Sequence, residues 1–244
     1  MIENPSFYSV IIGTELLNGR REDSHFAFLR QELNDRGWEY RGSFVIKDDP
    51  ALIEETFAFI KKDPRAVLFS FGGIGATPDD YTRKAAGAVF GKGLVRHKEA
   101  ERIILETFGE EAYPHRIHMA DLPENAKLLY NPVTKVPGFY LEDRWFFVPG
   151  FPQMARPMVI EALDRLYPKN RRKKSCSFVA QVSENALIDI MQQLPEDLEL
   201  SCLPKLEGQR RTAEIYLADM DEKRLQKWCR FFKEQMKLRS IEWI

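Results

Sequence analysis

Short apolar segments alternate with amphipathic ones along the first ninety residues. The short segments are rich in β-branched and aromatic side chains, as buried strands are; they are residues 7–13, 38–46 and 66–71. The amphipathic segments carry apolar side chains at helical spacing, such as Phe26, Leu29 and Leu33; they are residues 24–37, 51–62 and 81–91. This β-α-β-α-β-α order predicts an open, mostly parallel sheet with right-handed crossovers.

The pattern changes after residue 100. Residues 101–111 are expected to be helical and residues 127–132 extended. Residues 138–150 (GFYLEDRWFFVPG) read as two antiparallel strands joined by a turn at Glu142 and Asp143. A helix is expected over residues 154–167, with Pro157 in its first turn or at a kink.

A basic run divides the chain. Residues 168–174 (PKNRRKK) carry five positive charges and no apolar side chain, which favours a solvated linker over a nucleic-acid patch. We therefore predict a large domain over residues 1–167 and a small one over residues 175–244. The small domain is expected to have the order α-β-β-α, over residues 184–194, 199–206, 211–219 and 222–238.

Composition narrows the class of protein. Hydrophobic residues make up 44% of the chain, enough for a core, and 36 Lys and Arg balance 37 Asp and Glu. No overall basic field attracts nucleic acid or membranes, and neither is an expected partner. The N-terminus lacks the pattern of a signal peptide, and no apolar run has the length of a membrane span, so a cytoplasmic location is expected. The three cysteines, Cys176, Cys202 and Cys229, have no CxxC spacing and are expected to be reduced.

The stretch SFGGIGATPDD, residues 70–80, carries the main candidate chemistry. It follows a predicted parallel strand and precedes a predicted helix, where open α/β sheets bind ligands. Thr77 suits the N-cap of that helix, Pro78 its first position, and Asp80 the third, completing a capping box. The three glycines let the backbone approach a ligand closely, so its free N–H groups are expected to face an anion.

Two adjacent carboxylates in an anion-binding loop need an explanation. Asp79 and Asp80 would each stabilise a helix start by about 0.3–1 kcal/mol without any ligand, so a purely structural account stays open. A divalent cation reconciles the two features, because Mg²⁺ is held by one or two carboxylates together with phosphate oxygens. We expect Asp79 and Asp80 to bind such a metal. Glu15, after the first strand, is a further candidate, with an exposed loop carboxylate as its alternative.

Four segments together resemble a known family. IIGTELLNGRREDSH (residues 11–25), GGIGATPDDYTRKAA (72–86), NPVTKVPGF (131–139) and VPGFPQMARPM (148–158) resemble the molybdopterin-binding-like family, which includes MogA, MoaB and the N-terminal domain of CinA. Their order and spacing are most similar to the N-terminal region of CinA. The resemblance implies a three-layer α/β/α fold with a small β-rich excursion, and it assigns the short tail to a small α+β C-terminal domain.

The resemblance also implies the site residues. The catalytic candidates are Asp79, Asp80 and Glu15, with Asp79 and Asp80 as metal ligands. The ligand-binding candidates, matched position by position, are Gly13, Thr14, Gly72, Gly73, Gly75, Thr77, Thr82, Asn131, Pro137, Gly138, Pro149 and Gly150. Lys135 and Arg83 could neutralise phosphate, although solvated charges are the default. His25 could donate to a phosphate, although a solvent-facing ring is favoured. His115 and His118 are expected to be a surface pair.

The resemblance leaves two functions open. CinA-like domains are associated with metal-dependent hydrolysis of ADP-ribose at its pyrophosphate, with Mg²⁺, Mn²⁺ or Co²⁺ as cofactor. The alternative is a non-catalytic protein that binds molybdopterin or another pterin phosphate. In both cases the partner is a small phosphorylated molecule. Because relatives form dimers or trimers, the resemblance further implies a homo-oligomer.

Overall fold

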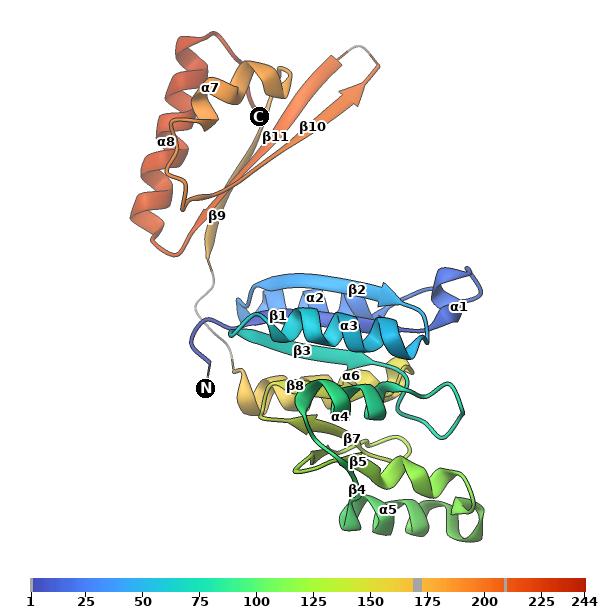
Figure 1. Cartoon of the computed structure of the whole chain (residues 1–244). Helices are drawn as coiled ribbons and strands as arrows, with labels where there is room; N and C mark the ends of the chain where they lie inside the picture. Colours follow the sequence, from blue (N-terminus) through green and yellow to red (C-terminus); the bar gives the residue numbers. More distant parts are fainter. Residues whose placement is uncertain (1, 169–172, 209) are drawn as a thin grey trace. The chain divides into compact units, whose positions relative to one another are not determined.

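The computed structural model describes residues 2–168, 173–208 and 210–244, which form two compact units, Met1–Asn170 and Arg171–Ile244 (Figure 1). Most of the predicted basic linker, residues 168–174, lies outside the described residues.

The first unit is built on a six-stranded sheet. Its order is β2-β1-β3-β8-β7-β6, parallel from β2 to β8 and antiparallel from β8 to β6. The strands are β1 (Ser6–Ile12), β2 (Tyr40–Ile46), β3 (Ala66–Phe71), β6 (Lys127–Leu129), β7 (Gly138–Leu141) and β8 (Trp145–Val148). Strands β7 and β8 form the predicted hairpin, and Glu142 and Asp143 in its turn both have the positive φ that two-residue hairpin turns favour. The mostly parallel sheet confirms the expected fold class.

Helices cover both faces of this sheet. They are α2 (His25–Arg36), α3 (Pro50–Lys61), α4 (Thr82–Phe90), α5 (Lys98–Phe108) and α6 (Pro152–Leu166). Successive side chains of β1 point to opposite faces: Phe7 packs in a core with α2 and α6, and Tyr8 in a core with α3, α4 and α5. The result is the predicted three-layer arrangement. Pro157 lies inside α6, beyond its first turn.

Local signals in the sequence explain several helix ends. Asp49 caps α3 by accepting a hydrogen bond of 2.9 Å from the Leu52 amide, and Pro50 occupies the first turn. Gly37 ends α2 in the left-handed conformation with φ of 76°, as its position predicts.

Short elements complete the first unit. A two-stranded antiparallel sheet pairs β4 (Leu94–Arg96) with β5 (Asp121–Pro123), and it forms the small β-rich excursion that the resemblance implied. The remaining pieces are α1 (Thr14–Leu17) and two 3-10 helices, Gly109–Ala112 and Arg116–Ala120.

The second unit is a three-stranded antiparallel sheet with helices packed against it. The strand order is β10-β11-β9, with β9 (Lys174–Ala180), β10 (Glu199–Glu207) and β11 (Arg210–Asp219). The helical elements are a 3-10 turn (Glu184–Leu187), α7 (Ile188–Met191) and α8 (Glu222–Leu238). The unit therefore begins with a strand, β9, that the sequence analysis did not include. Charge and serine at its start (KSCS) hide the strand pattern, and its pairing with β11 is a tertiary effect.

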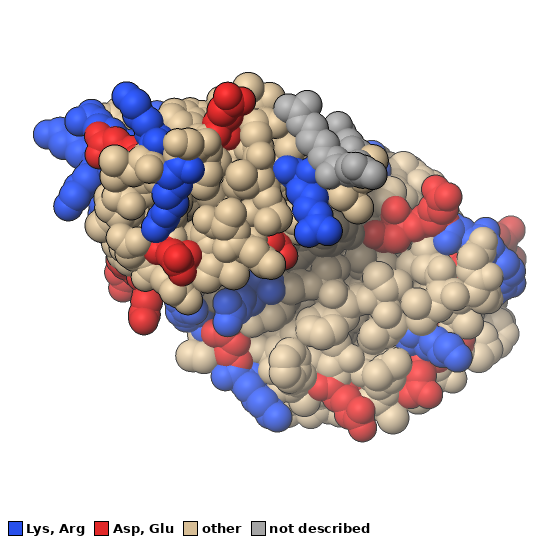
Figure 2. Space-filling model, turned by 90° about the horizontal axis from the view of Figure 1, so that it is seen from above, with Lys and Arg blue, Asp and Glu red and all other residues tan. Residues whose placement is uncertain are grey.

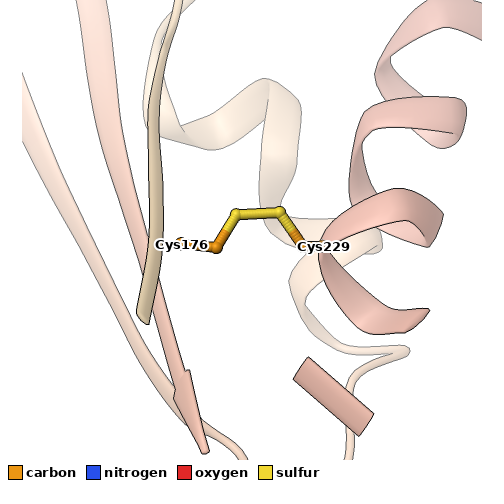
Figure 3. Close-up of a disulfide and its surroundings, with 2 residues drawn as sticks. All are labelled: Cys176 and Cys229. Carbon is orange, nitrogen blue, oxygen red and sulfur yellow. A yellow bond between two sulfur atoms is a disulfide. The ribbon is translucent and has the colours of Figure 1, made fainter. Parts of the chain in front are cut away.

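The expectation of reduced cysteines is wrong for two of the three. Cys176 on β9 and Cys229 on α8 form a disulfide, with their Cα atoms 6.6 Å apart (Figure 3). Their separation of 53 residues gives no short spacing to recognise, and only the packing of α8 on the sheet brings them together. Cys202 is free and half-buried, and burial raises the pKa of its thiol. The cytoplasmic location remains an expectation, without the support it drew from reduced thiols.

The hydropathy of the helices and the distribution of surface charge both match what the sequence predicts. None of the helices in the described part of the chain combines the length and the apolar sequence needed to span a bilayer. The face shown in Figure 2 carries Lys and Arg as well as Asp and Glu side chains, separated by uncharged residues, as the balanced composition predicts.

Candidate functional site

A pocket of about 560 Å³ lies where β1, β3 and β8 end, and all four family-like segments contribute to it. The predicted residues that line it are Gly13, Glu15, Gly72, Gly73, Gly75, Thr77, Asp79, Asp80, Asn131, Pro137, Pro149 and Gly150. Thr14, Thr82 and Gly138 do not line it. The carboxyl ends of parallel strands thus bring these segments to one edge of the sheet, although they are far apart in sequence.

The loop after β3 needs its glycines. Gly72 and Gly73 have φ of 98° and 67°, in the left-handed region that favours glycine. A Cβ on Gly72 would stand 2.6 Å from the Ile12 carbonyl oxygen, and one on Gly73 would stand 2.3 Å from Thr82 Oγ1. The loop is therefore packed against β1 on one side and the start of α4 on the other.

Several amides of this loop are free. Those of Gly75 and Thr77 donate to Asp80, and that of Gly72 donates to the Val148 carbonyl at 2.9 Å. The amides of Gly73, Ile74 and Ala76 donate to no atom of the described residues. All three residues line the pocket, so these N–H groups are available to an anion.

The predicted helix start is wrong in position. Helix α4 begins at Thr82 with Tyr81 as its N-cap, so Thr77 and Pro78 belong to the loop rather than to the helix. Thr82 is fully buried; its hydroxyl donates to the Gly72 carbonyl at 2.9 Å and its amide to the Gly73 carbonyl at 3.0 Å. Thr82 therefore anchors the loop and does not line the pocket.

Asp80 and Arg83 hold the loop in shape. Both carboxylate oxygens of Asp80 accept hydrogen bonds, Oδ1 from the Gly75 amide at 2.8 Å and Oδ2 from the Thr77 amide and hydroxyl. Arg83 is not a solvated charge: it is 9% exposed, donates to the carbonyls of Ile74 and Gly75, and does not line the pocket. Burial lowers the pKa of its guanidinium. Both carboxylate oxygens of Asp80 are thus bonded within the loop, whereas Asp79 is exposed and its carboxylate has no partner among the described residues.

The loop after β1 supplies a second free carboxylate. Glu15 lies over Gly13, where an added Cβ would stand 3.0 Å from the Glu15 carboxylate oxygens, and this carboxylate has no partner among the described residues. Thr14 instead binds Asp48, whose Oδ2 accepts from the Thr14 amide at 2.7 Å and hydroxyl at 2.9 Å. This contact ties the loop after β1 to the loop after β2.

His25 is buried, not solvent-facing as the sequence suggested. It is 4% exposed, and its ring stacks on Phe71 with centroids 4.4 Å apart. Nε2 lies 3.2 Å from the Gly150 carbonyl oxygen, which can only accept, so Nε2 carries the proton. Nδ1 is buried without a partner in the described residues. Burial is the main reason that the pKa of His25 is lowered.

The two later segments mainly shape the pocket wall. Asn131 is fully buried and closes its own loop, donating to the Val136 carbonyl at 3.0 Å and accepting from the Val133 amide. Gly138 packs under β8, where a Cβ would stand 2.5 Å from the Phe147 carbonyl oxygen. Lys135 is exposed and does not line the pocket.

Several residues that line the pocket were not predicted from the sequence. The missed residues include Arg21, Asp48, Phe108, Met119 and Phe151. Asp48 directly follows the second predicted strand, so its position at a strand's carboxyl end could have indicated it. Phe108 and Met119 belong to the excursion around β4 and β5, and nothing local in the sequence places them beside the sheet.

The residues present fit a metal ion that is coordinated in part by the protein and in part by phosphate oxygens of a ligand. In the described ranges no three His, Cys, Asp or Glu side chains come together in a way that could hold an ion by themselves. Glu15, Glu22 and Asp79 line one pocket with carboxylates that have no partner among the described residues, and Mg²⁺ needs only one or two carboxylates when phosphate oxygens complete its shell.

Comparisons with known proteins agree with this architecture. Residues 9–168 match the family model described as "Probable molybdopterin binding domain". A CinA-like protein of Syntrophotalea carbinolica is 34% identical over 202 residues, covering 78% of this chain and 49% of that protein. A protein of Thermococcus kodakarensis is 30% identical over 242 residues, covering 92% of this chain and 94% of that protein.

A solved structure extends the likeness to three dimensions. The crystal structure of the protein CinA with unknown function from Thermoplasma acidophilum is 26% identical and has a TM-score of 0.60, covering 66% of this chain and 97% of that one. The present chain spans about half the length of the Syntrophotalea carbinolica relative.

Proposed function

This chain belongs to the molybdopterin-binding domain family, and from that premise we propose that its pocket binds a phosphorylated nucleotide such as ADP-ribose with a divalent metal ion and hydrolyses it. The observation that supports the proposal most is the pairing of free amides and free carboxylates on one pocket. The amides of Gly73, Ile74 and Ala76 suit phosphoryl oxygens, and the carboxylates of Glu15 and Asp79 suit a cation.

Three other acidic residues of the pocket make structural hydrogen bonds, whereas Glu22 also lines the pocket with no side-chain partner among the described residues. Asp80 closes the glycine loop, Asp48 holds Thr14, and Asp23 accepts from the amides of His25 and Phe26 at the start of α2. We assign metal binding to Glu15 and Asp79 because, of the unpaired carboxylates, these two are the positions that the family resemblance implies, and Asp80 acts by positioning the loop. A divalent cation held there would neutralise the charge that develops on phosphoryl oxygens.

The proposed reaction consumes one water. Water attacks one phosphorus of the pyrophosphate, the bridging P–O bond breaks, and ADP-ribose yields AMP and ribose 5-phosphate. The loop amides would hold the phosphoryl oxygens in place, and the apolar wall around Phe71 and Met154 would limit access of bulk water.

The test is product formation from ADP-ribose with Mg²⁺, Mn²⁺ or Co²⁺, followed as AMP by chromatography. Asp79→Asn and Glu15→Gln are each expected to lower turnover at least tenfold with the fold intact, whereas Glu54→Gln on the exposed face of α3 serves as the matched control. Metal-dependent binding without turnover in the wild type would contradict the hydrolytic part.

The family match favours one second candidate, a non-catalytic protein that binds a pterin phosphate such as molybdopterin. The same loop amides would hold its phosphate. Calorimetric titration with molybdopterin separates the two functions: tight binding, with ADP-ribose neither bound nor cleaved, would support the second and exclude the first.

A further inference from the structure

We propose that Phe151, with Arg21 over its ring, is the surface of the pocket on which a planar heterocycle of the ligand stacks. The inference rests on the proposed function and deepens it by naming the ligand class: phosphorylated compounds that carry a planar aromatic ring, in preference to ring-free diphosphates.

Phe151 is an exposed aromatic residue inside a binding pocket. Its side chain is 50% exposed, and it lines the same pocket as the glycine loop. Exposure alone means little, because single hydrophobic residues are common on surfaces. Phe26 shows this: it is 41% exposed and has Arg30 5.8 Å from its ring centroid, yet it does not line the pocket. What distinguishes Phe151 is its location.

The backbone that carries Phe151 is held on both sides. Its carbonyl accepts from the amides of Met154 and Ala155, both at 2.9 Å, and Pro152 directly follows it in the first turn of α6. The preceding carbonyl, that of Gly150, accepts from the buried His25. The ring is therefore presented from ordered backbone, and little further ordering is needed when a ligand binds.

Arg21 gives this part of the pocket its positive charge. Its guanidinium carbon lies 5.3 Å from the centroid of the Phe151 ring, within the range of a cation–π contact. Among the described residues that line the pocket, it is the one with a permanent positive charge, whereas six carboxylates also line the pocket. A guanidinium beside a phenyl ring offers both a stacking plane and donors for a phosphorylated ligand.

The stacking surface adjoins the anion-binding loop. Gly150 lies against Gly72, since a Cβ on Gly150 would stand 3.3 Å from the Gly72 Cα. The residue before Phe151 thus touches the first glycine of the loop that offers free amides. One ligand can therefore place its phosphates on the loop and its ring on Phe151.

The test compares two ligands, ADP-ribose and inorganic pyrophosphate, in the presence of Mg²⁺, by rapid-mixing binding measurements that are complete before turnover. The variants are Phe151→Leu, which removes the aromatic face, and Phe151→Tyr, which keeps it; Phe26→Leu is the control. Phe151→Leu is expected to weaken ADP-ribose binding about fivefold or more, because fivefold corresponds to the smallest loss usually seen when a base loses its aromatic stacking partner. The same variant is expected to leave pyrophosphate binding unchanged. Phe151→Tyr and Phe26→Leu are expected to bind both ligands as the wild type does.

Each outcome has a separate meaning. If Phe151→Leu binds ADP-ribose as tightly as the wild type, the stacking surface is refuted while the proposed function stands. An equal loss for both ligands would show damage to the loop rather than lost stacking, and it would also refute the inference. If the wild type binds neither ligand, the proposed function fails and the inference fails with it.

Discussion

The carboxylate of Asp80 accepts two hydrogen bonds from Thr77, one from its amide at 2.7 Å and one from its hydroxyl at 2.6 Å. With the bond from the Gly75 amide, these contacts close the loop into a fixed turn ahead of α4. Asp80 and its neighbour Asp79 therefore have the same side chain but different roles: Asp80 bonds within the loop, and the Asp79 carboxylate is left unpaired.

The first prediction separates the two aspartates. Asp80→Asn replaces an acceptor oxygen with an NH₂ donor that faces an N–H group, so we expect the free energy of unfolding to fall by about 2 kcal/mol. Asp79→Asn changes an exposed carboxylate without partners and should alter it by less than about 0.5 kcal/mol. Urea unfolding measures both. Equal stability of the two variants would contradict the assignment of Asp80 to the loop.

The second prediction concerns Gly73. Gly73 and Gly91 share a φ of 67°, but an added Cβ has open space at Gly91 and would meet Thr82 Oγ1 at 2.3 Å at Gly73. Gly91→Ala is expected to cost about 1 kcal/mol, the backbone term alone. Gly73→Ala has the same backbone cost and in addition the steric clash of its Cβ with Thr82. The midpoint of its urea unfolding should therefore be lower than that of Gly91→Ala. Matching midpoints would show that Thr82 moves aside freely.

The third prediction concerns the disulfide. Cys176 and Cys229 are 53 residues apart, and loop-closure entropy for a cross-link of that span is about 4 kcal/mol. Reduction, or Cys176→Ser, should therefore lower the unfolding temperature of the second unit clearly. Thiol labelling checks the pairing directly: we expect Cys202 alone to react before reduction and all three cysteines after it. Cys202→Ser is the control and should keep the sensitivity to reductant.

The sequence predicted correctly those strands and helix ends that depend mainly on neighbouring residues. Residues 66–71 form the predicted strand, and Gly37 ends α2 as its position indicated, because burial and backbone conformation at these places depend on nearby residues. The start of α4 was misplaced because Thr77 and Asp80 satisfy the capping-box pattern while bonding within a loop. A capping-box pattern shows that the side chains could cap a helix, but it does not determine the residue at which the helix begins.

Contacts between distant segments account for the remaining differences. His25 is buried because Phe71 and Gly150, both far away in sequence, meet it at the sheet edge. Asp48 and Thr14 pair across neighbouring loops for the same reason. These contacts depend on the order of strands in the sheet, which the β-α alternation indicates only in part.

The last prediction follows from the buried His25. Its pKa in the folded protein is lowered, chiefly by burial, with Arg156 and Arg21 acting in the same direction and the Gly150 bond and Asp23 opposing. In the unfolded chain the ring titrates near 6.5. As the pH falls through about 6.5, the unfolded chain therefore takes up a proton that the folded protein resists. The stability contributed by neutral His25 is fully present above about pH 6.5 and is lost below it, by at most about 1.4 kcal/mol per pH unit.

Urea midpoints measured between pH 7.5 and 5.5 test this. The wild type should lose stability as the pH falls, and His25→Gln, whose amide can still donate to the Gly150 carbonyl but does not titrate, should show a flatter dependence. His115→Asn is the matched control: its ring is exposed in the folded protein, so its replacement should leave the wild-type slope. Because the wild type and His25→Gln differ in no other titrating group, the difference between their two slopes isolates His25. A His25→Gln profile parallel to that of the wild type would mean that His25 accepts its proton as readily in the fold as in water, contrary to its burial against Phe71.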